Sequence, residues 1–233
     1  MVRAVCMRCN RPEPVCVCSA LPAQKIFLNT KIMVLQHPCE LRKQIIGTVP
    51  LLALCLINFE LLIARATASG PPSSTPSEGD PAEAADREGG ERATPNNGAF
   101  DRLQRNPSLE EALADPGTLL LYPGPGAEDI ETMPPMEDGK PRTLIVVDGT
   151  WRQAGRVMRE TRVLQQAISA GTVRRVQFAH AGSSGYEFRK EPHDFCLSTL
   201  ESVAYTLRFL ERGADGVAAV EALSATFKLM VTP

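Results

Sequence analysis

The chain has 233 residues, of which 43% are hydrophobic and 5% aromatic, and its net charge is −2. This length favours one medium-sized core with additions and argues against two large domains, and the scarcity of aromatic residues favours an α/β protein whose parallel sheet is covered by helices. Taken as an average, the charge argues against a nucleic-acid partner, because RNA binding depends on Lys and Arg that neutralise phosphates.

Four cysteines lie within thirteen residues near the start of the chain: Cys6, Cys9, Cys16 and Cys18. The chain opens without the charged and apolar regions of a signal peptide, so we expect an intracellular, soluble protein, with the cytoplasm or nucleus favoured and an organelle left open. In such a compartment disulfides are the weaker explanation. The close pairs favour a structural Zn²⁺ site with four sulfur ligands in a small segment, residues 1–24; free or redox-active thiols are the alternative. The neighbouring Arg8 and Arg11 are expected at a surface that could touch RNA.

Three short apolar runs predict buried strands, and a fourth run, which alternates apolar and polar residues, predicts a more exposed strand. They are, in order, Lys31–Leu35, Thr118–Tyr122, Thr143–Val147 and Val173–Phe178. Helical patterns occupy Leu41–Leu62, Arg152–Ala170, Thr199–Glu211 and Gly216–Met230. No apolar run reaches the roughly 20 residues that span a bilayer, so no membrane partner is expected.

The alternation of strands and helices predicts a parallel sheet, whose ligands bind beyond the carboxyl ends of the strands. The segments after Leu35, Tyr122 and Val147 are therefore where a functional site is expected. We expect the folded domain to comprise residues 25–65 and 101–233.

Residues 66–100 form an acidic insertion rich in Pro, Ser and Gly without apolar periodicity, and such a composition predicts disorder. Within it, Ser77–Arg92 holds six acidic and two basic residues, a local charge of −4, so the rest of the chain carries +2. The mildly basic remainder is compatible with an RNA partner.

The strand that ends at Val147 leads into Asp148, Gly149, Thr150 and Trp151, the single tryptophan of the chain. An aspartate at the carboxyl tip of a buried strand is well placed for ligand or proton chemistry. A structural interpretation is equally compatible with the pattern, because Asp148 or Thr150 could cap the following helix and Trp151 could fill the core.

Two further segments also have a structural and a functional interpretation. Leu121-Tyr122-Pro123-Gly124 ends a strand in a Pro-Gly turn, whose backbone N–H groups and tyrosine edge could hold a ligand or form a plain turn. Leu197-Ser198-Thr199 opens a helix, in which Ser198 and Glu201 have the spacing of a capping box. Because helix N-termini also attract carboxylates, the same amides could bind a carboxylate group.

Several polar residues outside these segments are weaker candidates. His37 could be a ligand, an RNA contact or a loop histidine satisfied by its neighbours, and spacing favours the last. Arg189 and Lys190 are either phosphate contacts or a solvated strand edge. Nothing in the pattern marks Cys39, Cys55 or Cys196 as a nucleophile.

In this order, the segments resemble the DTW-domain family, which is named for an Asp-x-Thr-Trp element matched here by Asp148, Thr150 and Trp151. Five segments agree together, which argues against coincidence. They are Cys6 to Cys18, Gln36-His37-Pro38 with Arg42, Leu121 to Gly124, Asp148 to Trp151 with Gln153-Ala154, and Arg189-Lys190 through Leu197 to Glu201. One departure is Gly47-Thr48, where relatives often have Asn-Thr, so the substrate loop there could differ.

The resemblance implies a tRNA-uridine aminocarboxypropyltransferase related to the SPOUT-like knotted methyltransferases. Such an enzyme has a parallel sheet with a C-terminal trefoil knot that holds S-adenosylmethionine. It transfers the 3-amino-3-carboxypropyl group of S-adenosylmethionine to N3 of a uridine in tRNA and releases methylthioadenosine. The alternatives are a related RNA methyltransferase and a non-catalytic, zinc-containing RNA-binding protein. The expected partners are tRNA and S-adenosylmethionine, and both a monomer and a homodimer remain open.

The resemblance also assigns site residues. Asp148, with Thr150 and Trp151, is the catalytic element, in which Asp148 either removes the N3 proton or holds the sulfonium. The expected cofactor-binding residues are Leu121, Tyr122, Pro123, Gly124, Asp148, Leu197, Ser198 and Thr199. The expected RNA-binding residues are His37, Arg42, Arg152, Arg189 and Lys190, and the expected zinc ligands are Cys6, Cys9, Cys16 and Cys18.

Overall fold

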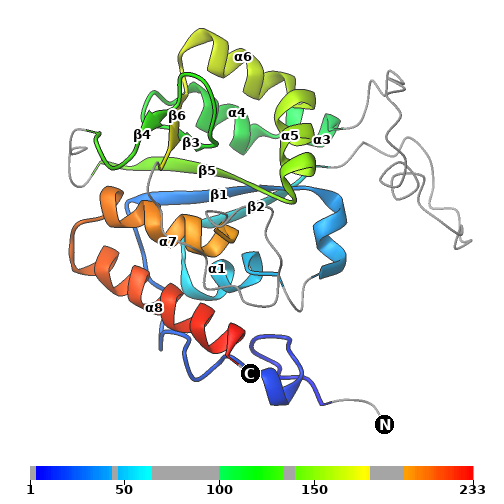
Figure 1. Cartoon of the computed structure of the whole chain (residues 1–233), viewed down its shortest axis with the longest axis vertical. Coiled ribbons are helices and arrows are strands. Elements are labelled where there is room, and N and C mark those ends of the chain that lie inside the picture. Colours follow the sequence, from blue (N-terminus) through cyan, green and yellow to red (C-terminus); the bar gives the residue numbers. More distant parts are fainter. Residues whose placement is uncertain (1–3, 44–46, 65–99, 134–139, 179–196, 233) are drawn as a thin grey trace, which may run out of the picture.

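The structure is a computed structural model that describes residues 4–43, 47–64, 100–133, 140–178 and 197–232 (Figure 1). Six strands form one sheet in the order β2-β1-β5-β3-β6-β4, and every neighbouring pair is parallel. The strands are β1 (Thr30–Gln36), β2 (Phe59–Ile63), β3 (Leu119–Leu121), β4 (Glu128–Asp129), β5 (Arg142–Asp148) and β6 (Arg174–Gln177). The predicted α/β class with a parallel sheet is confirmed.

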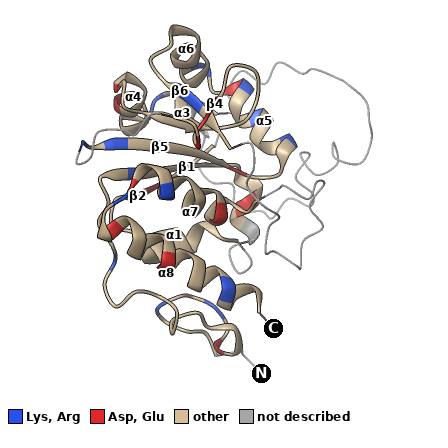
Figure 2. Cartoon of the chain, turned by 60° about the vertical axis from the view of Figure 1, so that its left-hand side comes forward, with Lys and Arg blue, Asp and Glu red and all other residues tan. Residues whose placement is uncertain are grey.

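Helices cover both faces of the sheet, as Figures 1 and 2 show from two directions. One face carries α1 (Val49–Cys55), α7 (Thr199–Leu210) and α8 (Ala214–Val231). The other carries α3 (Asp101–Gln104), α4 (Pro107–Ala114), α5 (Trp151–Glu160) and α6 (Arg162–Ala170). The chain also forms two short 3₁₀ helices. The first, η1 (Glu13–Val15), precedes β1, and the second, η2 (Pro38–Lys43), lies between β1 and α1.

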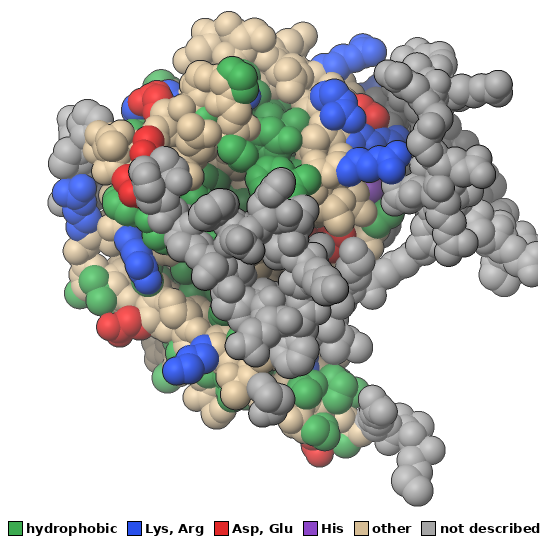
Figure 3. All heavy atoms as spheres, in the orientation of Figure 1, with side chains coloured by type: hydrophobic (Ala, Val, Ile, Leu, Met, Phe, Trp, Pro, Cys, Tyr) green, Lys and Arg blue, Asp and Glu red, His purple; other side chains and the backbone are tan. Residues whose placement is uncertain are grey.

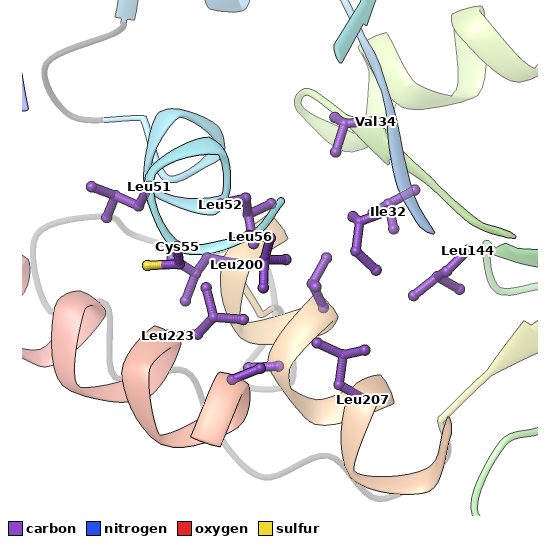
Figure 4. Close-up of a cluster of buried hydrophobic side chains, with 14 of the residues drawn as sticks. Ile32, Val34, Leu51, Leu52, Cys55, Leu56, Leu144, Leu200, Leu207 and Leu223 are labelled. Carbon is purple, nitrogen blue, oxygen red and sulfur yellow. The ribbon is translucent and has the colours of Figure 1, made fainter. Parts of the chain in front are cut away.

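Alternation along the central strands divides the core into two clusters, one on each face. Ile32 and Val34 of β1 pack in the cluster beneath α1, α7 and α8, whose side chains Figure 4 shows. Met33 and Leu35 belong to the cluster beneath α3 to α6. Both pairs are 0% exposed, and burial of such a side chain contributes about 1.5–3 kcal/mol relative to its exposed state. Because these strands are apolar on both sides, both faces of the sheet must be covered by helices, as is typical of parallel sheets.

The single helix predicted over Leu41–Leu62 is wrong. The segment forms part of η2, the short helix α1 and then the strand β2, which pairs with β1 from Ile32↔Phe59 to Gln36↔Ile63. Pro50 stands in the first turn of α1, where its missing N–H costs nothing. The helix ends at Cys55, and the side-chain amide of Asn58 then donates to the carbonyls of Leu28 and Thr30, which ties the start of β2 to β1. Tertiary pairing with β1 outweighs the helical pattern of the last five residues.

The helix predicted over Arg152–Ala170 is two helices, α5 and α6, that meet at Thr161. Thr161 is 0% exposed and has non-helical backbone angles, so the helix axis changes direction there. The short elements α3, α4 and β4 were not predicted.

Part of the expected organisation lies outside the described residues, namely the insertion up to residue 99 and the 179–196 segment on which a trefoil knot would depend. The last residue assigned to the insertion, Phe100, is 3% exposed and packs in the core beside α3. Among the helices described, none is both long and apolar enough to cross a membrane.

Candidate active site and cysteine cluster

The carboxyl ends of β1 and β5 lie side by side, with Gln36 opposite Asp148 in the strand register. The side-chain amide of Gln36 donates to Oδ2 of Asp148 at 2.9 Å. The hydroxyl of Thr199, at the start of α7, donates to the other oxygen, Oδ1. Hydrogen bonds to both oxygens are strongest when the carboxylate is ionised, so they hold the negative charge of Asp148 in a fixed orientation.

The residues after Asp148 turn the chain sharply into α5. Gly149 has a φ of 150°, and a Cβ placed on it would lie 3.0 Å from Cβ of Gln153 and 3.3 Å from Cβ of His37. Thr150 caps α5, and Gln153 returns its side chain to the Thr150 amide in a complete capping box. Thr150 is therefore the structural cap, whereas the side chain of Asp148 is directed to Gln36 and Thr199.

Trp151 does not fill the core, so this structural alternative is wrong. Its side chain is 49% exposed, and its ring meets that of Tyr122 edge to face, with 6.4 Å between centroids. An exposed tryptophan at a strand end offers a flat apolar surface to a ligand.

A cavity of about 340 Å³ lies beyond the carboxyl ends of β1, β3 and β5. This volume is within the usual range for small-molecule sites, roughly 300–1,000 Å³. The predicted residues that line it are Leu121, Tyr122, Pro123, Asp148, Thr150, Trp151, Leu197, Ser198 and Thr199. The structure thus brings together segments from three parts of the chain, as the position of ligands in parallel sheets predicts.

The cavity also has lining residues that were not predicted as site residues, and the polar and aromatic ones among them include Gln36, Glu40, Thr48, Gln177, Phe178 and Ser202. A signal was present for Gln36, because it is the last residue of β1 in the same way that Asp148 is the last residue of β5. For Thr48 the signal was its place beside Gly47 in the expected substrate loop, but its approach to α7 depends on how α1 packs.

The Pro-Gly turn after β3 differs from the expectation. Gly124 is not a cavity-lining residue, and its amide donates to the side chain of Gln177 at 3.2 Å. The amide of Tyr122 continues the sheet by donating to the carbonyl of Val176. These two backbone N–H groups are thus occupied, which leaves the Tyr122 ring and its neighbours Leu121 and Pro123 to face the cavity.

The predicted capping box at the start of α7 is confirmed. The Ser198 hydroxyl accepts from the amide of Glu201, and the Glu201 carboxylate accepts from the amide of Ser198. The Leu200 amide donates to the hydroxyl of Thr48 at 3.4 Å. With two of its first three amides used in this way, α7 offers an incoming carboxylate at most the amide of Thr199.

The RNA-binding candidates are placed very differently. His37 is 6% exposed, and its Nδ1 accepts from the amide of Cys39 at 3.3 Å, which matches the interpretation as a satisfied loop histidine. Arg152 is exposed in the first turn of α5. The side chain of Arg42 and the whole of Arg189 and Lys190 lie outside the described residues.

The sulfur atoms of Cys6, Cys9, Cys16 and Cys18 all lie within 4.8 Å of one another, and the six described cysteines of the chain are free thiols. The Cys6–Cys18 and Cys9–Cys16 separations are 3.5 and 3.7 Å. Tetrahedral zinc with bonds of about 2.3 Å would place its sulfur ligands about 3.8 Å apart, so the cluster fits such an ion. The amide N–H groups of Cys9 and Arg8 lower the pKa of Cys6 to about 6, which favours the thiolate that binds metals. The cluster could therefore bind a metal ion.

The cysteine segment is attached to the main core. Val17 and Leu21 are buried in the cluster beneath α8, and the Thr226 hydroxyl of α8 donates to the carbonyl of Ala20. Arg11 is 4% exposed, and its guanidinium contacts the Met230 sulfur at 3.0 Å and the Gly47 carbonyl at 3.4 Å. Arg11 is therefore a structural link to the loop that lines the cavity, which corrects its expected place on an RNA-facing surface.

Comparisons with known proteins match most of the chain. The family model described as "DTW domain" matches residues 3–233. The protein "tRNA-uridine aminocarboxypropyltransferase 2" of Macaca fascicularis is 32% identical over 210 residues, which cover 90% of this chain and 57% of that protein. Its namesake in Drosophila melanogaster is 30% identical over 90% of this chain and 67% of its own length.

A plant relative, "tRNA-uridine aminocarboxypropyltransferase A" of Arabidopsis thaliana, is 29% identical over 98% of this chain and 80% of its own length. The chain thus spans little more than half the length of the macaque relative. No solved structure matches it significantly.

Proposed function

The chain belongs to the DTW-domain family, and on this premise we propose that it is a tRNA-uridine aminocarboxypropyltransferase that uses S-adenosylmethionine. The observation that supports the proposal most directly is the Asp148 carboxylate, which Gln36 and Thr199 hold at the edge of a cavity of ligand size. The names of the relatives from Macaca fascicularis, Drosophila melanogaster and Arabidopsis thaliana support the same activity.

The proposed reaction forms a bond between N3 of uridine and the γ-carbon of the methionine group, breaks the bond between that carbon and sulfur, and releases the N3 proton. When bound, S-adenosylmethionine would supply a sulfonium, which makes this carbon electrophilic. The sulfur, with its adenosyl and methyl groups, is the leaving group and becomes neutral methylthioadenosine. The part of this chain is to orient the carbon toward N3, because the same cofactor also carries a transferable methyl group.

Asp148 has two candidate roles, and its hydrogen bonds favour the orienting one. A negative charge attracts the cationic cofactor, and donors on both oxygens preserve that charge. The same donors make the carboxylate a weaker base, since they stabilise the ionised form. In this role Asp148 holds the cofactor, and the N3 proton is released to solvent.

The walls of the cavity suit the remaining parts of the cofactor. Leu121, Pro123 and Phe178 provide apolar surface for an adenosyl group, and the rings of Tyr122 and Trp151 stand at the same wall. The Thr199 amide is the remaining group at the start of α7 for the amino-acid carboxylate. The C-terminal SPOUT-like knot that the resemblance implies is part of the same proposal.

The cysteine cluster is proposed to hold a structural zinc ion, because four thiols close the tetrahedral shell and leave no position for a substrate. The further RNA contacts are proposed at Arg42, Arg152, Arg189 and Lys190, whereas the burial of His37 favours a role in supporting the strand ends. A tRNA substrate is consistent with a protein inside the cell, for which the cytoplasm, the nucleus and an organelle all remain open.

The decisive experiment is incubation of the protein with unmodified tRNA and S-adenosylmethionine labelled in its carboxyl group, followed by mass analysis of the nucleosides. Label enters RNA only if the aminocarboxypropyl group is transferred, because methyl transfer leaves the carboxyl group on the by-product. A methylated nucleoside without label would support the related methyltransferase instead. Binding of tRNA without any modified nucleoside or methylthioadenosine would support a non-catalytic RNA-binding protein.

A further inference from the structure

The solvent face of α5 is a row of arginines. At about 100° of rotation per residue, Arg152, Arg156 and Arg159 fall within an arc of about 60°. The buried residues Ala154, Val157 and Met158 lie on the opposite side of the helix. The three arginines therefore lie on the helix face opposite the buried residues, and Figure 2 shows basic residues as blue segments along α5.

This arrangement costs stability within the helix. Arg152 stands in the first turn of α5, which contains no acidic residue and where the helix dipole already carries positive charge. Arg152 and Arg156 are four residues apart, a spacing at which like charges repel. Within α5, which the structure describes completely, Glu160 is the one acidic residue, and it pairs with Arg156 at 2.8 Å. Interactions within α5 thus favour Arg156, which pairs with Glu160, and Arg159, which stands in the last turn, but they do not explain Arg152.

The basic surface continues from α5 to α3. The Gln104 side chain donates to the Glu160 carbonyl at the end of α5, and the Arg156 guanidinium lies 5.7 Å from the centre of the Phe100 ring, just before α3. These contacts place α3 next to α5, and Arg102 of α3 and Arg105, which follows this helix, are exposed. Figure 3 shows a group of basic side chains over this region.

The arginine row begins at the cavity. Trp151 and Ala154, in the first turns of α5, line the cavity, and the next residues along the helix carry the guanidinium groups. A half-exposed tryptophan ring next to regularly spaced cations is the combination that binds single nucleic-acid strands, in which bases stack on aromatics and phosphates meet Arg or Lys. An acidic peptide would use the cations but not the ring.

We propose that the α5 arginine face, Arg152, Arg156 and Arg159 with the nearby Arg102 and Arg105, binds the phosphate backbone of the RNA strand whose uridine enters the cavity. This inference rests on the proposed function and specifies which surface receives the RNA. Trp151 then stacks on a base at the cavity entrance.

The test compares the charge reversals Arg159→Glu and Arg152→Glu/Arg159→Glu with the control Arg212→Glu. Arg212 is exposed and follows Glu211, which binds Thr30 at the amino end of β1, the opposite end of the sheet from the cavity. Arg156 is retained because of its pair with Glu160. Binding of unmodified tRNA is titrated without cofactor at several salt concentrations, and binding of S-adenosylmethionine and thermal unfolding are measured on the same proteins.

We expect Arg159→Glu to weaken tRNA binding about tenfold and to lower the salt slope by about one, with a larger effect in the double variant. Arg212→Glu should stay close to wild type, and S-adenosylmethionine binding should not change in any variant. Equal tRNA affinity and salt slope in all three variants would overturn the inference. So would stronger competition by an acidic peptide than by RNA of equal charge, which would identify a protein partner.

Failure of the inference is distinct from failure of the proposed function. A wild-type protein that modifies tRNA, with reversals that bind as the control does, refutes only the α5 surface. A wild-type protein that neither binds tRNA nor transfers the carboxyl label refutes both.

Discussion

The side-chain amide of Gln36 donates to the carboxylate of Asp148 at 2.9 Å, although 112 positions separate the two residues in the chain. The contact exists because β1 and β5 are adjacent parallel strands that end at the same level. Thr199 completes the arrangement from α7 and thereby links the sheet to the helix that covers it. The orientation of the carboxylate is thus set by three separate elements, which makes it sensitive to each of them.

Replacement of Asp148 by Asn should lower kcat by at least about 100-fold, because the amide group removes the charge and turns one acceptor into a donor facing Gln36 or Thr199. Gln36→Ala should lower kcat less, because it removes one hydrogen bond to Asp148 and leaves the carboxylate in place. Rates and KM for S-adenosylmethionine are measured across pH. In the orienting role, KM for S-adenosylmethionine rises and the defect persists at alkaline pH. Recovery at high pH, where N3 of uridine ionises by itself, would instead identify Asp148 as the base.

Trp151→Ala should raise KM for tRNA about tenfold and leave thermal stability nearly unchanged, because the ring is half-exposed and one base stack contributes about 1–3 kcal/mol. Trp151→Phe keeps an aromatic face and serves as the matched control, which should recover most of the affinity. A large loss of stability in Trp151→Ala, with unchanged KM, would mean that the ring supports the fold after all.

Gly149→Ala should destabilise the protein by about 2 kcal/mol or more, since the residue has a φ of 150° and its Cβ would lie 3.0 Å from Gln153 and 3.3 Å from His37. Gly171→Ala is the control, because Gly171 also has a positive φ, 70°, but no atom within 4 Å of the added Cβ. Its cost should be about 1 kcal/mol. Urea unfolding gives the loss in free energy of unfolding for each variant. Equal losses in Gly149→Ala and Gly171→Ala would show that the neighbours of Gly149 move aside without an energetic cost.

Metal analysis of the purified chain should find one zinc ion per molecule. Cys9→Ser should lose the ion and lower the unfolding temperature, because Cys9 is buried in the cluster and packs with the main core. Cys39→Ser, which changes a thiol outside the cluster, should retain zinc. Stoichiometric zinc in Cys9→Ser would argue against the four-sulfur site.

A strong chelator provides a second test of the cysteine cluster. Removal of the ion should also slow tRNA modification, because Arg11 connects the cysteine segment to Gly47 at the cavity. A metal-free protein with full stability and activity would exclude a structural role for the ion.

The sequence by itself determined the parallel sheet, its central strands, the capping box at Ser198 and the grouping of the four cysteines. Each of these depends on local information: periodic burial along a strand, a hydroxyl three residues before its partner, or thiols close in the chain. The position of Asp148 at a strand end was equally readable, since ligands of parallel sheets bind at that edge.

Only the tertiary structure decided which interpretation of each motif holds. It paired Phe59–Ile63 with β1 in spite of a helical pattern, because the edge of the sheet offers hydrogen bonds that local propensity cannot report. It buried Arg11 and left Trp151 half-exposed. It also brought Gln36 and Thr199 to the two oxygens of Asp148, an arrangement of distant residues that depends on strand order and helix packing rather than on any spacing in the chain.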